Sequence, residues 1–262
     1  PSVKEREIIK TKMVEVINAL RLKDWEFPSD GMFTGLTRDD LKDNRFLEAP
    51  CYLYLLRGMY ELTGNVDWLN WYKRAASEVP KGGIKTRSEV CAEGIPYDLS
   101  FWKGRKNNSY LWIYVMKQAS LVELASLEKE APIKAKYKEG LKKNREFVLE
   151  VAKGYTKFDN KDSTIFGNTD WRACYTEWFP QFTIVEAIAV SKLRNDAKAG
   201  LRKNYERDYM TTPLAAASIL ALAENPEDCK LIDEVVSHYD YSKLFLSEFF
   251  YAEFAYYFKS CK

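Results

Sequence analysis

The amino-acid sequence predicts an all-α fold, and more specifically an α/α toroid built from about five helical hairpins. Apolar residues recur at the three- and four-residue spacing of helices along most of the chain, and alternating runs that would indicate strands are confined to short pieces within 80–107. Amphipathic segments alternate with segments that are apolar around most of their circumference, as outer and inner helices would. Long connections also alternate with short ones, which is the pattern of paired antiparallel helices.

The predicted helices belong to an outer and an inner layer. We expect outer helices at 4–20, 133–153, 197–207 and 227–238, and inner helices at 46–62, 108–128, 173–193, 211–223 and 243–258. Gly64-Asn65 and Asn225-Pro226 are signals that end one helix and begin the next. Pro132 and Pro213 stand where the first turn of a helix tolerates proline.

The first predicted helix carries a single apolar stripe. Its members recur at three- and four-residue intervals, and they are Ile8, Ile9, Met13, Val16, Ile17 and Leu20. Polar residues occupy the opposite face, as in an amphipathic helix at the surface of a helical protein. We therefore place 4–20 in the outer layer.

Three long loops are expected to share one end of the molecule. They run from Trp25 to Arg45, from Pro80 to Asn107 and from Gly154 to Asp170, and each leads into an apolar segment. Because the other connections are short, the helices pair antiparallel and the long loops emerge on one rim. Without a low-complexity linker, the chain is expected to form a single domain over 1–262.

The composition of the chain limits the classes of partner that we expect. The formal net charge is only +2, so the sequence shows no basic surface typical of nucleic-acid binding, and we expect no nucleic-acid partner. No apolar stretch is long enough for a membrane span. The chain begins at Pro1 without methionine, which indicates a processed N-terminus and leaves a secretory leader open. We expect a secreted or periplasmic protein.

Several kinds of site are not supported. The five cysteines lack CxxC spacing, which favours free thiols and requires no disulfide. His238 is the only histidine, and one histidine without partners at ligand spacing makes no zinc site, so we expect no metal. Phosphate-binding and dinucleotide-binding glycine motifs are absent, so we expect no cofactor.

The long loops combine aromatic residues with carboxylates, amides and an arginine. Tryptophan and tyrosine rings stack on sugar faces, and polar side chains bind the hydroxyls, so an oligo- or polysaccharide is the expected ligand. The candidate substrate-binding residues are Trp25, Asp30, Trp102, Asn107, Asn108, Tyr110, Trp171, Arg172 and Trp178. The candidate catalytic residues are Asp98, Asp170, Glu177 and Tyr175.

Two mechanisms suit these residues. A glycoside hydrolase needs two carboxyl groups, one as acid and one as base or nucleophile, for which Asp98, Asp170 and Glu177 are candidates. A β-eliminating polysaccharide lyase needs a tyrosine for proton transfer and polar groups that neutralise the substrate carboxylate. The residues that could supply those functions are Tyr110, Tyr175, Arg172, Asn107 and Asn108.

Two short stretches resemble the alginate-lyase family, whose members adopt an α/α toroid. Lys106-Asn107-Asn108-Ser109-Tyr110 is similar to that family's Asn-Asn-His-Ser-Tyr-Trp motif, and Arg172-Ala173-Cys174-Tyr175 is similar to its Arg-Ala and Tyr stretch. The resemblance implies that Asn107 or Asn108 binds a uronate carboxylate and that Tyr175 is the catalytic tyrosine. The motif's histidine is absent here. The architecture also resembles the toroid glycoside hydrolases of gut bacteria.

Three classes of function remain open from the sequence. The first is an enzyme that cleaves glycans at the loop rim, by hydrolysis or by elimination. The second is a non-catalytic glycan-binding protein on the same scaffold, which the missing histidine favours. The third is a helical protein-interaction domain, because exposed aromatic patches also mark protein partner sites.

Overall fold

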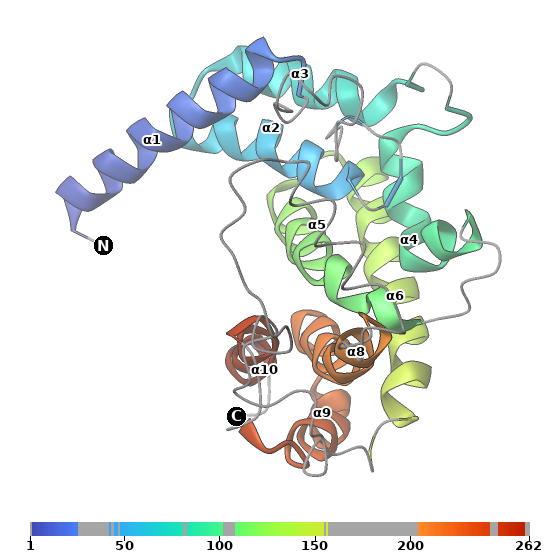
Figure 1. Cartoon of the computed structure of the whole chain (residues 1–262). Coiled ribbons are helices and arrows are strands. Elements are labelled where there is room, and N and C mark those ends of the chain that lie inside the picture. Colours follow the sequence, from blue (N-terminus) through green and yellow to red (C-terminus); the bar gives the residue numbers. More distant parts are fainter. Residues whose placement is uncertain are drawn as a thin grey trace, which may run out of the picture. The chain divides into compact units, whose positions relative to one another are not determined.

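The computed structural model describes residues 2–25, 42, 45–46, 48–80, 83–101, 108–154, 156, 204–241 and 246–259. Every regular element in these ranges is a helix, which confirms the all-α prediction (Figure 1). The chain divides into two compact units. Unit 1 comprises Pro1–Lys106 with Met116–Asn144, and unit 2 comprises Asn107–Val115 with Arg145–Lys262. The toroid and the single domain stay predictions.

The described residues of unit 1 form six helices. They are α1 (Val3–Leu22), α2 (Ala49–Thr63), α3 (Val66–Ser77), α4 (Arg87–Phe101), most of α5 (Val115–Leu127) and the N-terminal part of α6 (Ala131–Lys153). The connection from α2 to α3 confirms the Gly64-Asn65 signal. Gly64 ends α2 with a left-handed φ of 70°, and the Asn65 side chain accepts a hydrogen bond from the Asp67 amide at 2.9 Å.

The segment between Pro80 and Asn107 corrects our expectation. We predicted a long loop with short strand pieces, whereas α4 occupies most of this segment. Its helical periodicity is interrupted at Gly94, whose φ of 68° and ψ of −158° are not helical, and Pro96 follows two residues later. The element is therefore two short helices joined by a kink, and neither half is long enough to give a clear helical pattern.

The kink in α4 packs against α6 at very short range. The Asn144 side chain accepts a hydrogen bond from the Ile95 amide at 2.7 Å and donates one to Gln118 of α5 at 2.8 Å. A Cβ atom at Gly140 would lie 1.9 Å from the Cys91 carbonyl oxygen. The backbones of α4 and α6 can approach this closely only because Gly140 has no side chain.

A second buried polar cluster joins α3, α5 and α6. The Tyr72 hydroxyl donates a hydrogen bond to Glu128 and lies 2.9 Å from the Tyr137 hydroxyl. Glu128 also accepts the amides of Lys129 and Glu130, so its carboxylate stabilises the turn that leads into α6. Burial is the main cause that raises the pKa of both tyrosines, which therefore stay protonated.

Unit 2 is centred on α8 (Asn204–Leu222). The consecutive alanines Ala215, Ala216 and Ala217 are fully buried, and α10 (Leu246–Phe258) and the short helix η2 (Asn108–Tyr114) pack on α8. The Ser218 hydroxyl lies 2.7 Å from the Tyr251 carbonyl oxygen of α10 and can donate a hydrogen bond to it.

The C-terminal part of α6 is attached to the start of α9 (Cys229–Val236) by an ion pair. Arg145 donates two hydrogen bonds of 2.7 Å to the buried carboxylate of Asp228. Asn225 caps the preceding short helix η5 (Pro226–Asp228), as the Asn225-Pro226 signal predicts.

Three further expectations have mixed outcomes. Pro132 lies in the first turn of α6, as predicted, but Pro213 lies inside α8, because this helix begins at Asn204 and not near 211. Cys51 and Cys91 are free thiols, as expected, whereas Cys229 is disulfide-bonded. Within the described ranges, no helix is long and apolar enough to cross a membrane.

The contact between α4 and α6 can be tested by adding one methyl group. We expect Gly140→Ala to lower the free energy of unfolding by about 1–3 kcal/mol, because the new Cβ would overlap the Cys91 carbonyl oxygen. Gly58→Ala in α2 is the matched control, since no atom lies within 4 Å of its new Cβ. The control should raise stability by about 0.4–1 kcal/mol in urea unfolding. Equal effects of the two changes would contradict the close approach.

Candidate functional site

A pocket of about 540 Å³ lies in unit 1. Its lining combines aromatic, cationic and acidic side chains from α1, α2, α3 and α4. The lining residues are Arg21, Asp24, Trp25, Lys42, Tyr52, Leu56, Trp71, Arg74, Ala75, Glu78, Pro80 and Arg87.

One wall of the pocket is the C-terminal end of α1. The Trp25 amide donates to the Leu20 carbonyl at 2.8 Å, and the Asp24 amide donates to the Arg21 carbonyl at 3.1 Å. This pair of bonds is a Schellman motif, which terminates a helix with a left-handed residue, usually glycine. Here Asp24 and Trp25 adopt φ values of 54° and 68°. Such backbone conformations are strained for side chains other than glycine, and they cluster at functional sites.

Aromatic rings support this strained turn. The Trp25 ring meets the Tyr52 ring edge to face at a centroid distance of 5.1 Å and the Trp68 ring at 6.4 Å. Trp68 in turn contacts Trp71 at 4.8 Å. Trp25 is only 6% exposed, so most of its ring belongs to the core of unit 1 and its remaining surface contributes to the pocket wall.

Arg87 is the buried cation of the pocket. Its guanidinium donates hydrogen bonds to the Lys42 carbonyl at 2.7 Å and to the Ala75 carbonyl at 3.4 Å. The guanidinium carbon also lies 5.0 Å from the centroid of the Tyr52 ring, within cation–π range. These contacts hold the positive charge at a fixed place in the lining.

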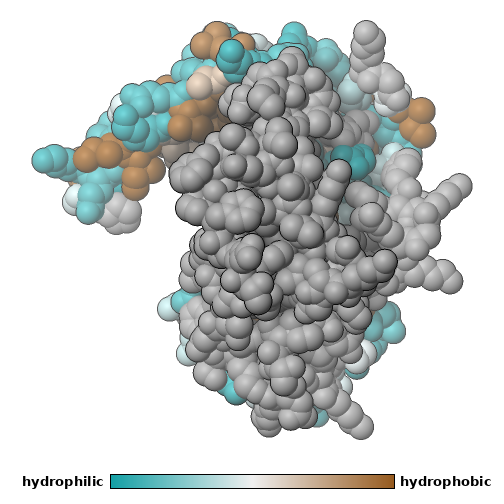
Figure 2. Space-filling view, in the orientation of Figure 1, coloured by the Kyte–Doolittle hydropathy of each residue, from teal (hydrophilic) through white to brown (hydrophobic). Residues whose placement is uncertain are grey.

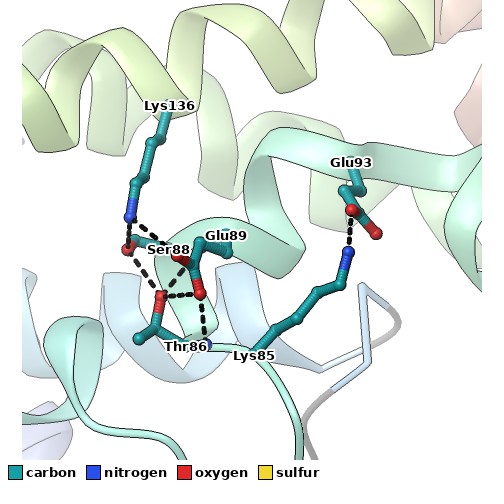
Figure 3. A network of polar contacts seen from close by, with 6 residues as sticks. All are labelled: Lys85, Thr86, Ser88, Glu89, Glu93 and Lys136. Carbon is teal, nitrogen blue, oxygen red and sulfur yellow. Dashed lines mark hydrogen bonds and ion pairs between the residues drawn. The ribbon is translucent and has the colours of Figure 1, made fainter.

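The start of α4 is anchored on both sides of Arg87 (Figure 3). Thr86 and Glu89 form a capping box, in which the Thr86 amide donates to the Glu89 carboxylate at 2.8 Å and the Glu89 amide donates to the Thr86 hydroxyl at 3.2 Å. The hydrogen bond from the Thr86 amide is the main cause that lowers the pKa of Glu89. Lys136 of α6 donates to Ser88 at 3.2 Å, and Lys85 pairs with Glu93. The backbone of Arg87 is therefore fixed by its neighbours.

The charges of the lining give the pocket an excess of positive groups. Among the described lining residues, four are cationic and two are acidic. Asp24 pairs with Lys42 at 2.6 Å, and Glu78 lies 3.8 Å from Arg74.

Arg21 lies 5.3 Å from the centroid of the Trp71 ring. A planar aromatic surface beside a guanidinium suits a ligand that has both an apolar face and an anionic group. No group of three or more histidine, cysteine or acidic residues that could hold a metal occurs in the part of the chain that the structure describes.

The structure describes the side chains of two of the residues proposed from sequence. Trp25 lines the pocket. Asp98 is 1% exposed and accepts a hydrogen bond from the Phe46 amide at 2.8 Å, so in the described structure it stabilises the segment before α2. Asn108 and Tyr110 belong to η2, where only the backbone is described. Asp30, Trp102, Asn107, Asp170, Trp171, Arg172, Tyr175, Glu177 and Trp178 lie outside the described residues.

The remaining pocket residues are not among those proposed from the sequence. Trp71 and Arg74 lie in α3, outside the long loops to which we assigned function. Arg87 lies within the predicted loop from Pro80 to Asn107, but it was not among the candidates chosen there. A signal was present in α3, where two tryptophans stand three residues apart and an arginine follows within a turn. Such spacing places these side chains on adjacent parts of one helix face.

The strain at the end of α1 can be tested with glycine. We expect Asp24→Gly to raise the free energy of unfolding by about 1 kcal/mol, because glycine adopts a positive φ without steric cost. The ion pair to Lys42 that is lost is largely exposed on the Asp24 side and stabilises little. Asp67→Gly in the first turn of α3 is the control and should destabilise. A loss of stability from both changes, measured by urea unfolding, would rule out strain at Asp24.

Comparisons with known proteins identify no family for this chain. No protein-family model matches the chain, and searches of curated proteins and of solved structures find no significant match.

Proposed function

We propose that this chain is a carbohydrate-active protein that binds an acidic glycan, such as a uronate-containing chain, in the pocket of unit 1. The observation that supports the proposal is the presence of aromatic rings and an excess of cationic side chains in one lining. Trp71 offers a ring to the apolar face of a sugar, and the neighbouring Arg21 and Arg74 offer donors to its carboxylate.

Arg87 makes the pocket selective for an anion in this proposal. A guanidinium that is buried and held by two backbone carbonyls loses little conformational entropy when it binds a ligand. Its charge is poorly screened by solvent, so it favours an anionic ligand over a neutral one of the same shape.

The enzymatic form of the proposal is a polysaccharide lyase. Elimination from a uronate requires that cations neutralise the substrate carboxylate, and cations predominate in the pocket. Hydrolysis requires a protonated carboxyl group beside an ionised one. Asp24 and Glu78, the two carboxylates among the described lining residues, both pair with a cation, which favours elimination. The resemblance to the alginate-lyase motif implies Tyr175 as the proton-transfer residue, and this tyrosine lies outside the described residues.

Two broader proposals accompany this function. An α/α toroid is the arrangement that we propose for the complete set of helices, because it places long loops together around a glycan site. A secreted or periplasmic location is supported by the disulfide at Cys229, because disulfides persist in oxidising compartments.

Glycan binding can be tested with variants of pocket residues that are at least partly exposed. We expect Trp71→Ala to weaken binding of an oligouronate by about 1 kcal/mol or more, since an aromatic contact with the sugar is lost. Arg74→Gln should weaken it through the lost charge, and the effect should shrink as salt is added. Isothermal titration calorimetry with an oligouronate and with a neutral oligosaccharide of equal length measures both effects.

Matched controls exist in the same unit. Tyr60→Ala removes an aromatic side chain outside the lining, and Lys134→Gln removes a cation outside it. Both variants should bind the oligouronate as the unmodified chain does. Equal affinity for the acidic and the neutral oligosaccharide, or unchanged affinity in Trp71→Ala and Arg74→Gln, would refute the proposal.

The reaction can be tested independently of binding. We expect the chain to release products from a polyuronate that absorb ultraviolet light through their new double bond. Tyr175→Phe should abolish this absorbance and leave oligouronate binding intact, because only the proton-transfer hydroxyl is removed. Release of reducing ends without the absorbance would instead identify a hydrolase.

A further inference from the structure

The first helix presents its apolar stripe to solvent. Ile9, Met13 and Val16 are 49%, 45% and 57% exposed, and hydrophobic residues are visible along this helix in Figure 2. Ile17 is the buried residue of α1, and the N-terminal half of the helix extends beyond α2 and α3 (Figure 1). We predicted an amphipathic outer helix with one apolar stripe. In the structure, most of the stripe faces away from the other helices of unit 1 and is exposed to solvent.

Four residues of the stripe, of which Leu20 is partly buried and the others are exposed, have the spacing of a coiled-coil seam. Ile9, Met13, Val16 and Leu20 are separated by four, three and four residues. This 4-3-4 spacing assigns them to positions d, a, d and a of a heptad, the positions that face a second helix in a coiled coil. Solvent exposure of such a seam is unfavourable, at about 25 cal/mol per Å² of apolar surface. The stripe therefore fits a helical partner.

The charges beside the seam favour a second copy of this chain as the partner. In this heptad Glu5 occupies position g and Lys10 occupies position e, five residues apart. In a parallel pair of identical helices, g of one helix lies beside the following e of the other. Glu5 of each copy would thus lie beside Lys10 of the second copy, and the twofold axis would generate the ion pair twice.

Lys10 is available for such a pair, because it makes no ion pair with any residue in the described ranges. In an antiparallel pair, position e lies beside e and position g beside g, so Glu5 would not lie beside Lys10 of the second copy.

We propose that α1 is a homodimerisation surface, in which two copies of the chain associate through a parallel, two-stranded coiled coil along Ile9, Met13, Val16 and Leu20. A helix of 20 residues is about 30 Å long, which provides few seam layers. We therefore expect the association to be weak and reversible, as small interfaces are. The proposal is independent of the ligand of the pocket.

Sedimentation equilibrium over a roughly hundredfold range of protein concentration tests the proposal. The unmodified chain should change from monomer to dimer across this range. Met13→Glu should abolish dimer formation, because it places two carboxylates at the centre of the seam. Thr11→Glu is the matched control: it introduces the same charge at an exposed position outside the seam, and the variant should still dimerise. A chain that stays monomeric, or equal dimerisation of the two variants, overturns the proposal.

Charge exchange tests the parallel orientation. Glu5→Lys and Lys10→Glu should each weaken the dimer, since each places like charges beside one another. The double variant should restore the dimer, because the ion pair is rebuilt with reversed signs. Glu5 also belongs to the capping box with Ser2, so circular dichroism of each variant measures any loss of helix. A double variant that dimerises no better than either single variant would overturn the parallel arrangement.

Discussion

The buried guanidinium of Arg87 is the interaction on which the pocket of unit 1 depends. A charge removed from water must be compensated by hydrogen bonds or by other charges. The Lys42 and Ala75 carbonyls and the Tyr52 ring supply part of this compensation, and they come from three separate stretches of the chain. Loss of Arg87 would therefore leave these segments without a common partner, and the effect would extend beyond ligand binding.

The positions of several helices could be predicted from the sequence, but the residues at which the helices begin and end were predicted less well. The periodic segments at 133–153 and 46–62 became α6 and α2 with shifts of a few residues, because amphipathic pattern and capping residues act locally. The helix α4 was missed because its geometry depends on a tertiary contact. Gly94 takes a positive φ, and Asn144, fifty residues later, accepts the amide that follows it. Local sequence does not contain that contact.

The candidate site was harder to predict than the helices. Trp25 was proposed from its place in a loop, and it does line the pocket, but most of its ring packs in the core. Asp98 appeared in a segment that we took for a loop, and its burial against Phe46 follows from the helix that we did not expect. Arg74 and Trp71 resembled ordinary surface residues of an amphipathic helix. Only the packing of α1 against α2 and α3 brings them beside Arg21.

The Schellman turn at the end of α1 connects this helix to the pocket of unit 1. Its amide hydrogen bonds belong to the helix, whereas the side chains of Asp24 and Trp25 belong to the pocket lining. A backbone amide exchanges its hydrogen with solvent only when its hydrogen bond opens. The exchange lifetimes of these two amides therefore depend on fraying of the helix and on occupancy of the pocket. A bound molecule that stabilises the turn would lengthen the exchange lifetimes of both amides.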